Sequence, residues 1–167
     1  AKLEVTGKLF IDGDTTHFHV PTSVSSDGVL KARYIAVNTP ESTGQIEEWG
    51  KKASNFTREK LSNAESIIVE SNDGEWHKDS SGGRFMAWVW YKPKGASEYR
   101  NLNLELVQNG LSLASGANTD KYGTITQQAY IQAKNYKLNA FSGEKDPDFY
   151  YGGAIPVDLK TLRANID

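Results

Sequence analysis

An arginine, two oxygen-bearing side chains and a glutamate occur close together in residues 33–41. Arg33 comes first, Asn38 and Thr39 follow an apolar run, and Glu41 stands two residues further on. A guanidinium can bind a phosphate, oxygen donors suit a hard cation, and a carboxylate can orient or deprotonate water. The types and spacing therefore indicate a candidate site, because sites concentrate where strands pass into loops. The alternative is a salt-bridged arginine followed by an ordinary Thr-Pro-Glu turn.

The predicted strand indicates which partner Arg33 needs and where Thr39 and Glu41 point. Alternation over residues 29–37 puts Arg33 on a face with apolar neighbours, so we expect acidic partners or a phosphate opposite it. Pro40 ends this strand and biases Thr39 toward an extended conformation. The Thr39 carbonyl and the Glu41 carboxylate would then point outward at the rim.

Two other segments carry chemistry of a related kind. The first is Asp-Gly-Asp-Thr at residues 12–15, where two carboxylates with little bulk between them can offer oxygen ligands to a hard cation. Asp-Gly is equally a common hairpin turn. The second is Asp-Ser-Ser-Gly-Gly-Arg at residues 79–84, where Gly82 and Gly83 let a ligand approach the backbone and Arg84 stands at the start of a strand. By itself that segment is a flexible hairpin.

The elements that must position these segments follow from hydrophobic periodicity. Period-two alternation or short apolar runs predict strands, with a bulge at Gly7 in the first, and period-3.6 stripes predict helices. Asn103 is the predicted N-cap of the second helix, which Gly110 would end. Such an order fits a small α+β domain around a partly closed barrel. The predicted strands are 2–11, 16–20, 29–37, 67–69 and 86–91, and the predicted helices are 46–64, 103–107 and 125–140.

Composition narrows the function classes. A chain of 167 residues suits one domain, and it contains no cysteine, which excludes disulfides, thiolate metal sites and cysteine nucleophiles. No apolar run is long enough to span a bilayer. The formal net charge of −2 means that a polyanion must be held by a local cluster in a cleft.

Some further candidates have weaker support. His17 and His19 share a strand face at a spacing that could ligate a transition metal, but no third ligand is in view and we expect a solvated face. Trp49 and Phe56 lie on the stripe of the first helix and are expected in the core. There is no Gly-x-Ser-x-Gly elbow of a serine hydrolase.

Over residues 9–141 the chain resembles the staphylococcal nuclease family of thermonuclease-like domains. The shared features occur in the family's order, which makes coincidence an unsatisfactory explanation. They are Asp-Gly-Asp-Thr at 12–15, Arg33 through Thr39-Pro40-Glu41, Gly83-Arg84 before a hydrophobic strand, Asn103 with Leu106-Val107 and Gly110-Leu111, and Lys137-Leu138-Asn139.

The resemblance implies a five-stranded OB-fold β-barrel with three α-helices. It also implies a Ca²⁺-dependent, sugar-non-specific phosphodiesterase, an endo- or exonuclease for DNA and RNA in single-stranded or denatured form. By matched motif, Asp14, Asn38 and Thr39 are the implied metal ligands, with Thr39 binding through its carbonyl. Glu41 is implied to act on the attacking water, and Arg33 and Arg84 to clamp the phosphate and take part in catalysis.

The departures from the family pattern concern the metal and nucleotide positions. Asn38 stands where the family has aspartate, which keeps an oxygen donor but removes one negative charge, so we expect weaker Ca²⁺ binding or a shifted metal preference. The family's lysine-tyrosine pair is replaced around Ser81 and Gly82 in this chain. The family's tyrosines after the second helix are replaced near Gly116 and Asn118. The alternative function is a catalytically impaired module that binds nucleic acid or protein.

The resemblance also sets expectations for organisation and location. We expect a nuclease-like domain over residues 1–144 and, over residues 145–167, an extension or linker toward a further domain. A small helical stripe at 157–162 is predicted within that extension. The family implies a secreted or cell-surface protein, and we expect a monomer.

Overall fold

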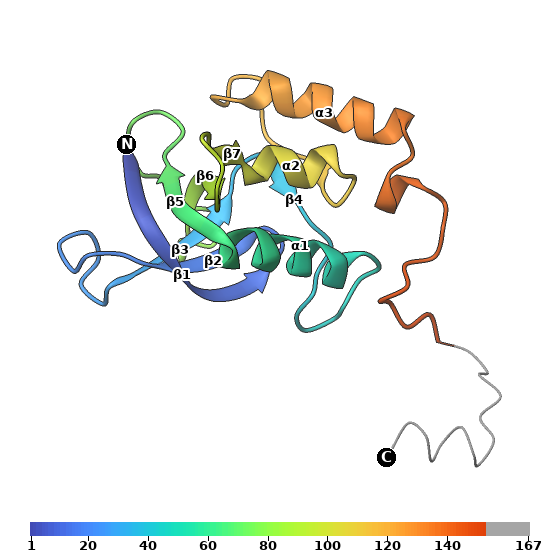
Figure 1. The fold of residues 1–167 in the computed structure, drawn as a ribbon, viewed down its shortest axis with the longest axis horizontal. Helices are drawn as coiled ribbons and strands as arrows, with labels where there is room; N and C mark the ends of the chain where they lie inside the picture. Colours follow the sequence, from blue (N-terminus) through green and yellow to red (C-terminus); the bar gives the residue numbers. More distant parts are fainter. Residues whose placement is uncertain (153–167) are drawn as a thin grey trace, which may run out of the picture.

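The computed structural model describes residues 1–152, which form strands and helices in the order shown in Figure 1. Within this part of the chain no helix is long and apolar enough to cross a bilayer. The elements are β1 (Lys2–Asp12), β2 (Thr15–His19), β3 (Val29–Tyr34), β4 (Val37–Asn38), α1 (Gly50–Ser62), β5 (Ala64–Glu70), β6 (Phe85–Pro93), β7 (Arg100–Asn101), α2 (Leu102–Gln108), β8 (Leu113–Ala114), α3 (Gly123–Asn135) and a 3₁₀ turn, η1 (Asn139–Phe141).

Five of the strands close into a barrel. They are hydrogen-bonded in the order β3-β2-β1-β5-β6, and a parallel pairing of β3 with β6, from Ala32 opposite Phe85 to Tyr34 opposite Ala87, closes the ring. The pairing of β1 with β2 shifts register between Gly7 and Leu9, as the predicted bulge requires. This barrel and the three α-helices confirm the predicted α+β OB-fold.

The core fills the barrel and extends under the helices. α1 packs on β1, while α2 lies between β6 and α3. Figure 1 shows α3 and the strands β1 and β2 on opposite sides of the molecule. The largest fully buried apolar and aromatic side chains include Phe18, Tyr34, Val69, Val89, Tyr91, Leu102, Leu106 and Leu111.

The predicted strand over 29–37 is wrong as a single element. β3 ends at Tyr34, and Ala36 adopts a left-handed φ of 66° before β4 begins. The turn is held from a distance, because the Ile35 N–H donates to the Ala87 carbonyl at 2.9 Å and the Asn103 side-chain amide donates to the Ile35 carbonyl at 2.9 Å. The turn matters for the site because it folds the chain after Arg33 back over that side chain.

The helix starts also differ from prediction. Asn101, and not Asn103, caps α2, because its side-chain oxygen accepts a hydrogen bond from the Leu104 N–H at 3.0 Å. Asn103 is fully buried and is used for the turn above. The first helix begins at Gly50, later than predicted, after Trp49 in a left-handed conformation. Gly110 ends α2 with a positive φ, as predicted.

The division at residue 144 stays a prediction, and the stripe at 157–162 lies outside the described residues.

Candidate active site

The acidic turn between β1 and β2 is fixed against α1. The Thr57 hydroxyl donates to the Gly13 carbonyl at 2.6 Å. A Cβ atom at Gly13 would lie 2.9 Å from the Cβ of Ala53 and 3.0 Å from the Thr39 side chain, closer than side chains pack. Glycine is therefore required where the turn passes between α1 and residue 39, and this approach delivers Asp14 to the end of β4.

Asp14 is the residue that joins the two motifs. Its side chain is buried, its Oδ1 accepts a hydrogen bond from the Thr15 hydroxyl at 3.0 Å, and its Oδ2 accepts one from the Thr39 N–H at 3.0 Å. The Nη2 of Arg33 lies 3.3 Å from the same Oδ2. The prediction of an acidic partner opposite Arg33 is thereby confirmed.

Arg33 is oriented by the backbone as well as by Asp14. Its Nη1 donates to the carbonyls of Tyr34 at 3.0 Å and Val37 at 2.9 Å, both on the turn that interrupts the predicted strand. Its side chain is only 19% exposed. A long cationic side chain is thus held in one place, which lowers the entropy lost when it binds an anion.

Arg84 is held in a similar way from the other side. Its Nε donates to Asp79 Oδ2 at 2.7 Å and its Nη1 to the Thr15 hydroxyl at 3.3 Å. Burial raises the pKa of Asp79, but hydrogen bonds from Ser81 and Arg84 outweigh it and lower the pKa overall. The carboxylate therefore stays ionised as a partner for Arg84, whose side chain remains 35% exposed.

A continuous chain of contacts connects the two arginines, running from Arg84 through Thr15 and Asp14 to Arg33. Both arginines line one open cavity of about 520 Å³. The rest of the lining includes small and polar residues, among them Ser80, Ser115, Gly116 and Ala117, together with Asn72, His77 and Asp120. Two fixed guanidiniums at one cavity can grip a tetrahedral anion from two directions.

Glu41 lies at the edge of this arrangement and does not line the cavity. Its backbone N–H donates to Glu47 Oε1 at 2.9 Å, and its carbonyl accepts from the Glu47 N–H at 2.9 Å. Partial burial and then the negative charges of Asp12 and Asp14 raise the pKa of Glu41. Glu41 is therefore close enough to feel both acidic residues of the β1–β2 turn.

Asn38 is placed apart from the arginines. Its backbone N–H donates to the Ser112 hydroxyl at 2.8 Å within the pairing of β4 with β8, and the residue is exposed. It borders a smaller hollow of about 250 Å³ shared with Thr39 and Leu113. Asn38 is thus connected to the site through its neighbour Thr39, whose N–H donates to Asp14.

The donors at this point fit a hard cation in type. Asp14, Asn38, Thr39 and Glu41 offer only oxygen atoms, and the Thr39 hydroxyl is buried without a hydrogen-bond partner among residues 1–152. Within residues 1–152 no group of three or more His, Cys, Asp or Glu side chains is arranged so that it could hold a metal. The neutral Asn38 side chain contributes an oxygen donor without a negative charge.

Two residues that hold the arginines, one in the contact chain and one beside it, were not singled out from sequence. Thr15 bridges Arg84 and Asp14, and Asp79 orients Arg84. Each lies inside a segment that the sequence did mark, and their polar side chains next to Asp14 and before Gly82 were the available signal. Their partners became visible only when β2 and the β5–β6 loop were brought together.

Comparison with known proteins agrees with this geometry. The family model described as "Staphylococcal nuclease homologue" matches residues 31–142. A thermonuclease of Staphylococcus intermedius is 31% identical over 137 residues, which cover 79% of this chain and 72% of the relative. A thermonuclease of Staphylococcus hyicus is 33% identical over 137 residues, with the same shares. With its motifs, barrel and matched residues in agreement, the chain belongs to the family of staphylococcal nuclease homologues.

Proposed function

We propose that this protein is a nuclease that hydrolyses phosphodiester bonds of DNA and RNA in single-stranded or denatured form. The observation that carries the proposal is the contact chain Arg84–Thr15–Asp14–Arg33, which holds two guanidiniums at one cavity. Family membership and similarity to two thermonucleases support the same reaction. An extracellular location remains a prediction that rests on the family resemblance.

The proposed mechanism assigns each residue one task. Arg33 and Arg84 bind the non-bridging oxygens of the scissile phosphate and stabilise the negative charge that grows on them as water attacks. Glu41 takes the proton of the attacking water, for which a raised pKa makes it a better base. The new P–O bond forms as the bond to the leaving sugar oxygen breaks, and that oxygen takes a proton from solvent.

Calcium is the proposed cofactor. Asp14, Asn38 and the Thr39 carbonyl would hold it, and a bound cation would add positive charge beside the phosphate. Because Asp14 also pairs with Arg33, the same carboxylate couples the metal position to the phosphate clamp.

The test is hydrolysis of denatured DNA with Ca²⁺ and with EDTA, in wild type, Glu41→Gln and Arg84→Ala. We expect Ca²⁺-dependent cleavage that falls by roughly two to four orders of magnitude in each variant. Glu98→Gln and Arg58→Ala are matched controls, since both residues are exposed and distant in sequence from the site. Controls that lose as much activity as the site variants would contradict the assigned roles.

The alternative, a module that binds without cleaving, is favoured by the neutral Asn38 at a position where the family has aspartate. It predicts no hydrolysis with Ca²⁺, Mg²⁺ or Mn²⁺, together with retained binding of single-stranded DNA. Under that outcome, Asn38→Asp should restore cleavage if the missing carboxylate is the cause. Retained binding without any cleavage would replace the nuclease proposal.

A further inference from the structure

The outer face of β1, β2 and β3 continues from the candidate site. In the antiparallel register Thr15 is opposite Arg33, and the next outward pair is His17 opposite Lys31. On the other side of β2, His17 is opposite Leu9 of β1. Because alternate residues share a strand face, Arg33, Lys31 and His17 lie on one continuous surface. The candidate site thus opens onto this face along β2 and β3.

Positive charge gathers on this surface. Partial burial and then the charges of Lys31, Lys8 and Arg84 lower the pKa of His17, so all three cations act on this side chain. Lys8 and Lys31 are exposed, and within residues 1–152 neither takes part in an ion pair. In contrast, Arg33 and Arg84 each have a carboxylate partner. Two lysines are therefore free to bind an anion beside two arginines that are already oriented.

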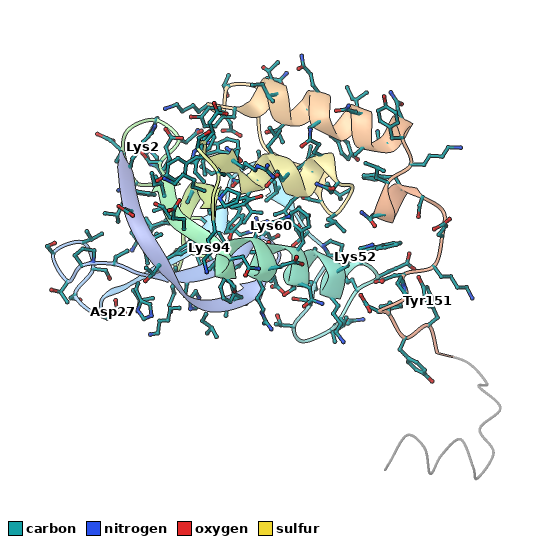
Figure 2. All side chains as sticks on the ribbon, in the orientation of Figure 1. Lys2, Asp27, Lys52, Lys60, Lys94 and Tyr151 are labelled. Atoms are coloured by element: carbon teal, nitrogen blue, oxygen red, sulfur yellow. The ribbon has the colours of Figure 1, made fainter. Side chains whose placement is uncertain are left out.

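An acidic residue and an apolar residue also belong to this region of the surface. A hydrogen bond from Ser25 and, least, the charge of Lys31 lower the pKa of Asp27 in the β2–β3 loop, which is labelled in Figure 2. Leu9, which is opposite His17 in the β1–β2 register, is 50% exposed. An exposed apolar side chain among lysines is suited to contact with an unstacked base.

We propose that Lys8, Leu9, His17 and Lys31, the outer strip, bind the backbone of a single-stranded nucleic acid whose scissile phosphate lies at Arg33 and Arg84. The proposal rests on the proposed nuclease function. Lys31 is one two-residue step from Arg33, about 7 Å along the strand, so successive cations can meet successive phosphates of an extended chain. A net charge of −2 for the whole protein makes this local cluster the means of attraction.

The decisive variant is Lys8→Gln with Lys31→Gln, which removes two charges from the strip and leaves the arginines unchanged. The first measurement is fluorescence anisotropy of labelled oligo(dT) in EDTA across a salt series. We expect roughly tenfold weaker binding at low salt, and a log–log salt slope that falls by about 0.7 for each lost phosphate contact. This measurement does not depend on cleavage, so it separates the strip from the nuclease proposal.

The second measurement compares kcat and KM on oligo(dT) and on a thymidine dinucleotide, with Ca²⁺. We expect the double variant to raise KM on the polymer with kcat unchanged and to leave dinucleotide hydrolysis as in wild type. The matched control is Lys94→Gln with Lys134→Gln, which removes the same charge from the turn after β6 and from α3. If the wild-type protein binds oligo(dT) through the outer strip but does not cleave it, the nuclease proposal is contradicted and the proposal for the outer strip is supported.

Two outcomes would overturn the proposal that the outer strip binds nucleic acid. One is equal binding and salt slope in wild type and the Lys8/Lys31 variant. The other is an equal loss in the Lys94/Lys134 control, because that would assign the effect to overall charge and not to this face.

Discussion

The backbone N–H of Trp49 donates a hydrogen bond of 2.6 Å to Oδ2 of Asp146, a residue 97 positions later in the chain. Trp49 has a φ of 69°, and no side chain of its own caps α1, so Asp146 supplies the acceptor at the helix start. Asp146 is only 2% exposed. Figure 2 shows Lys52 of α1 and Tyr151 of the C-terminal segment on the same side of the molecule. A segment beyond the matched family residues therefore completes the first helix.

This contact bears on Glu41 through backbone packing. A Cβ atom at Gly50 would overlap the carbonyl oxygen of Glu41, so the start of α1 and the Glu41 backbone touch directly. We expect Asp146→Ala to lower the free energy of unfolding by about 1–3 kcal/mol and to reduce kcat more than it raises KM. Urea unfolding and kinetics below the transition would measure both effects.

Asp146→Asn keeps an acceptor oxygen and should recover most of the stability and activity. The control Asp148→Ala removes a nearby carboxylate that does not accept the Trp49 hydrogen bond. Equal behaviour of Asp146→Ala and Asp148→Ala would show that the contact with Trp49 is not what matters.

We expect the Thr15 hydroxyl to help hold both Arg33 and Arg84 in position. Thr15→Val removes the donor to Asp14 and the acceptor for Arg84 with little change in volume, and the site is buried. We expect a loss of about 1–2 kcal/mol in unfolding free energy and a roughly tenfold fall in kcat/KM on DNA. Thr15→Ser retains the hydroxyl and should stay near wild type. A Thr15→Val enzyme with unchanged kinetics would remove Thr15 from the site.

The charge at position 38 should set metal affinity. Asn38→Asp adds a carboxylate beside Thr39, and we expect the dissociation constant for Ca²⁺ to fall by roughly tenfold, because ligand charge tunes calcium sites. Isothermal titration calorimetry measures this directly and without substrate. Asn135→Asp adds the same charge on exposed α3 and should leave the affinity unchanged. Equal Ca²⁺ affinities for wild type and Asn38→Asp would exclude residue 38 as a ligand.

A buried glutamate outside the site should control stability in acid. Glu70 accepts hydrogen bonds from Lys121 at 2.8 Å, Tyr122 at 2.8 Å and Trp90 at 3.0 Å. Burial raises its pKa, but these hydrogen bonds outweigh burial and hold the pKa below its ordinary value of 4.5. A depressed folded pKa means that the ionised group stabilises the fold above 4.5 and that this contribution is lost as pH falls through the folded pKa.

We therefore expect Glu70→Gln to lower the unfolding free energy by about 2 kcal/mol at neutral pH, since Lys121 then lacks its charged partner. The difference from wild type should shrink when urea unfolding is repeated at increasingly acidic pH below 4.5. The exposed Glu98→Gln is the control and should track wild type at each pH. A Glu70→Gln difference that does not change with pH would mean that ionisation of Glu70 contributes nothing.

Local patterns in the sequence determined most of the barrel and the makeup of the site. Period-two alternation identified β1 and β2, and strong β-propensity identified β6. The acidic turn, residues 33–41 and Gly83-Arg84 identified the residue types of the candidate site, because each motif is contiguous. Arg33 on an apolar face required an acidic partner or a phosphate opposite it, and that inference needed no coordinates.

Tertiary structure alone decided the contacts that orient those residues. β3 stops at Tyr34 because Ala87 and Asn103 take the hydrogen bonds of Ile35, and no local pattern around Ile35 reveals partners so far along the chain. The same holds for the cap that Asp146 provides to α1. Hydrophobic periodicity reports which side of an element is buried, but a hydrogen bond between distant residues depends on the direction and distance that only the folded chain establishes.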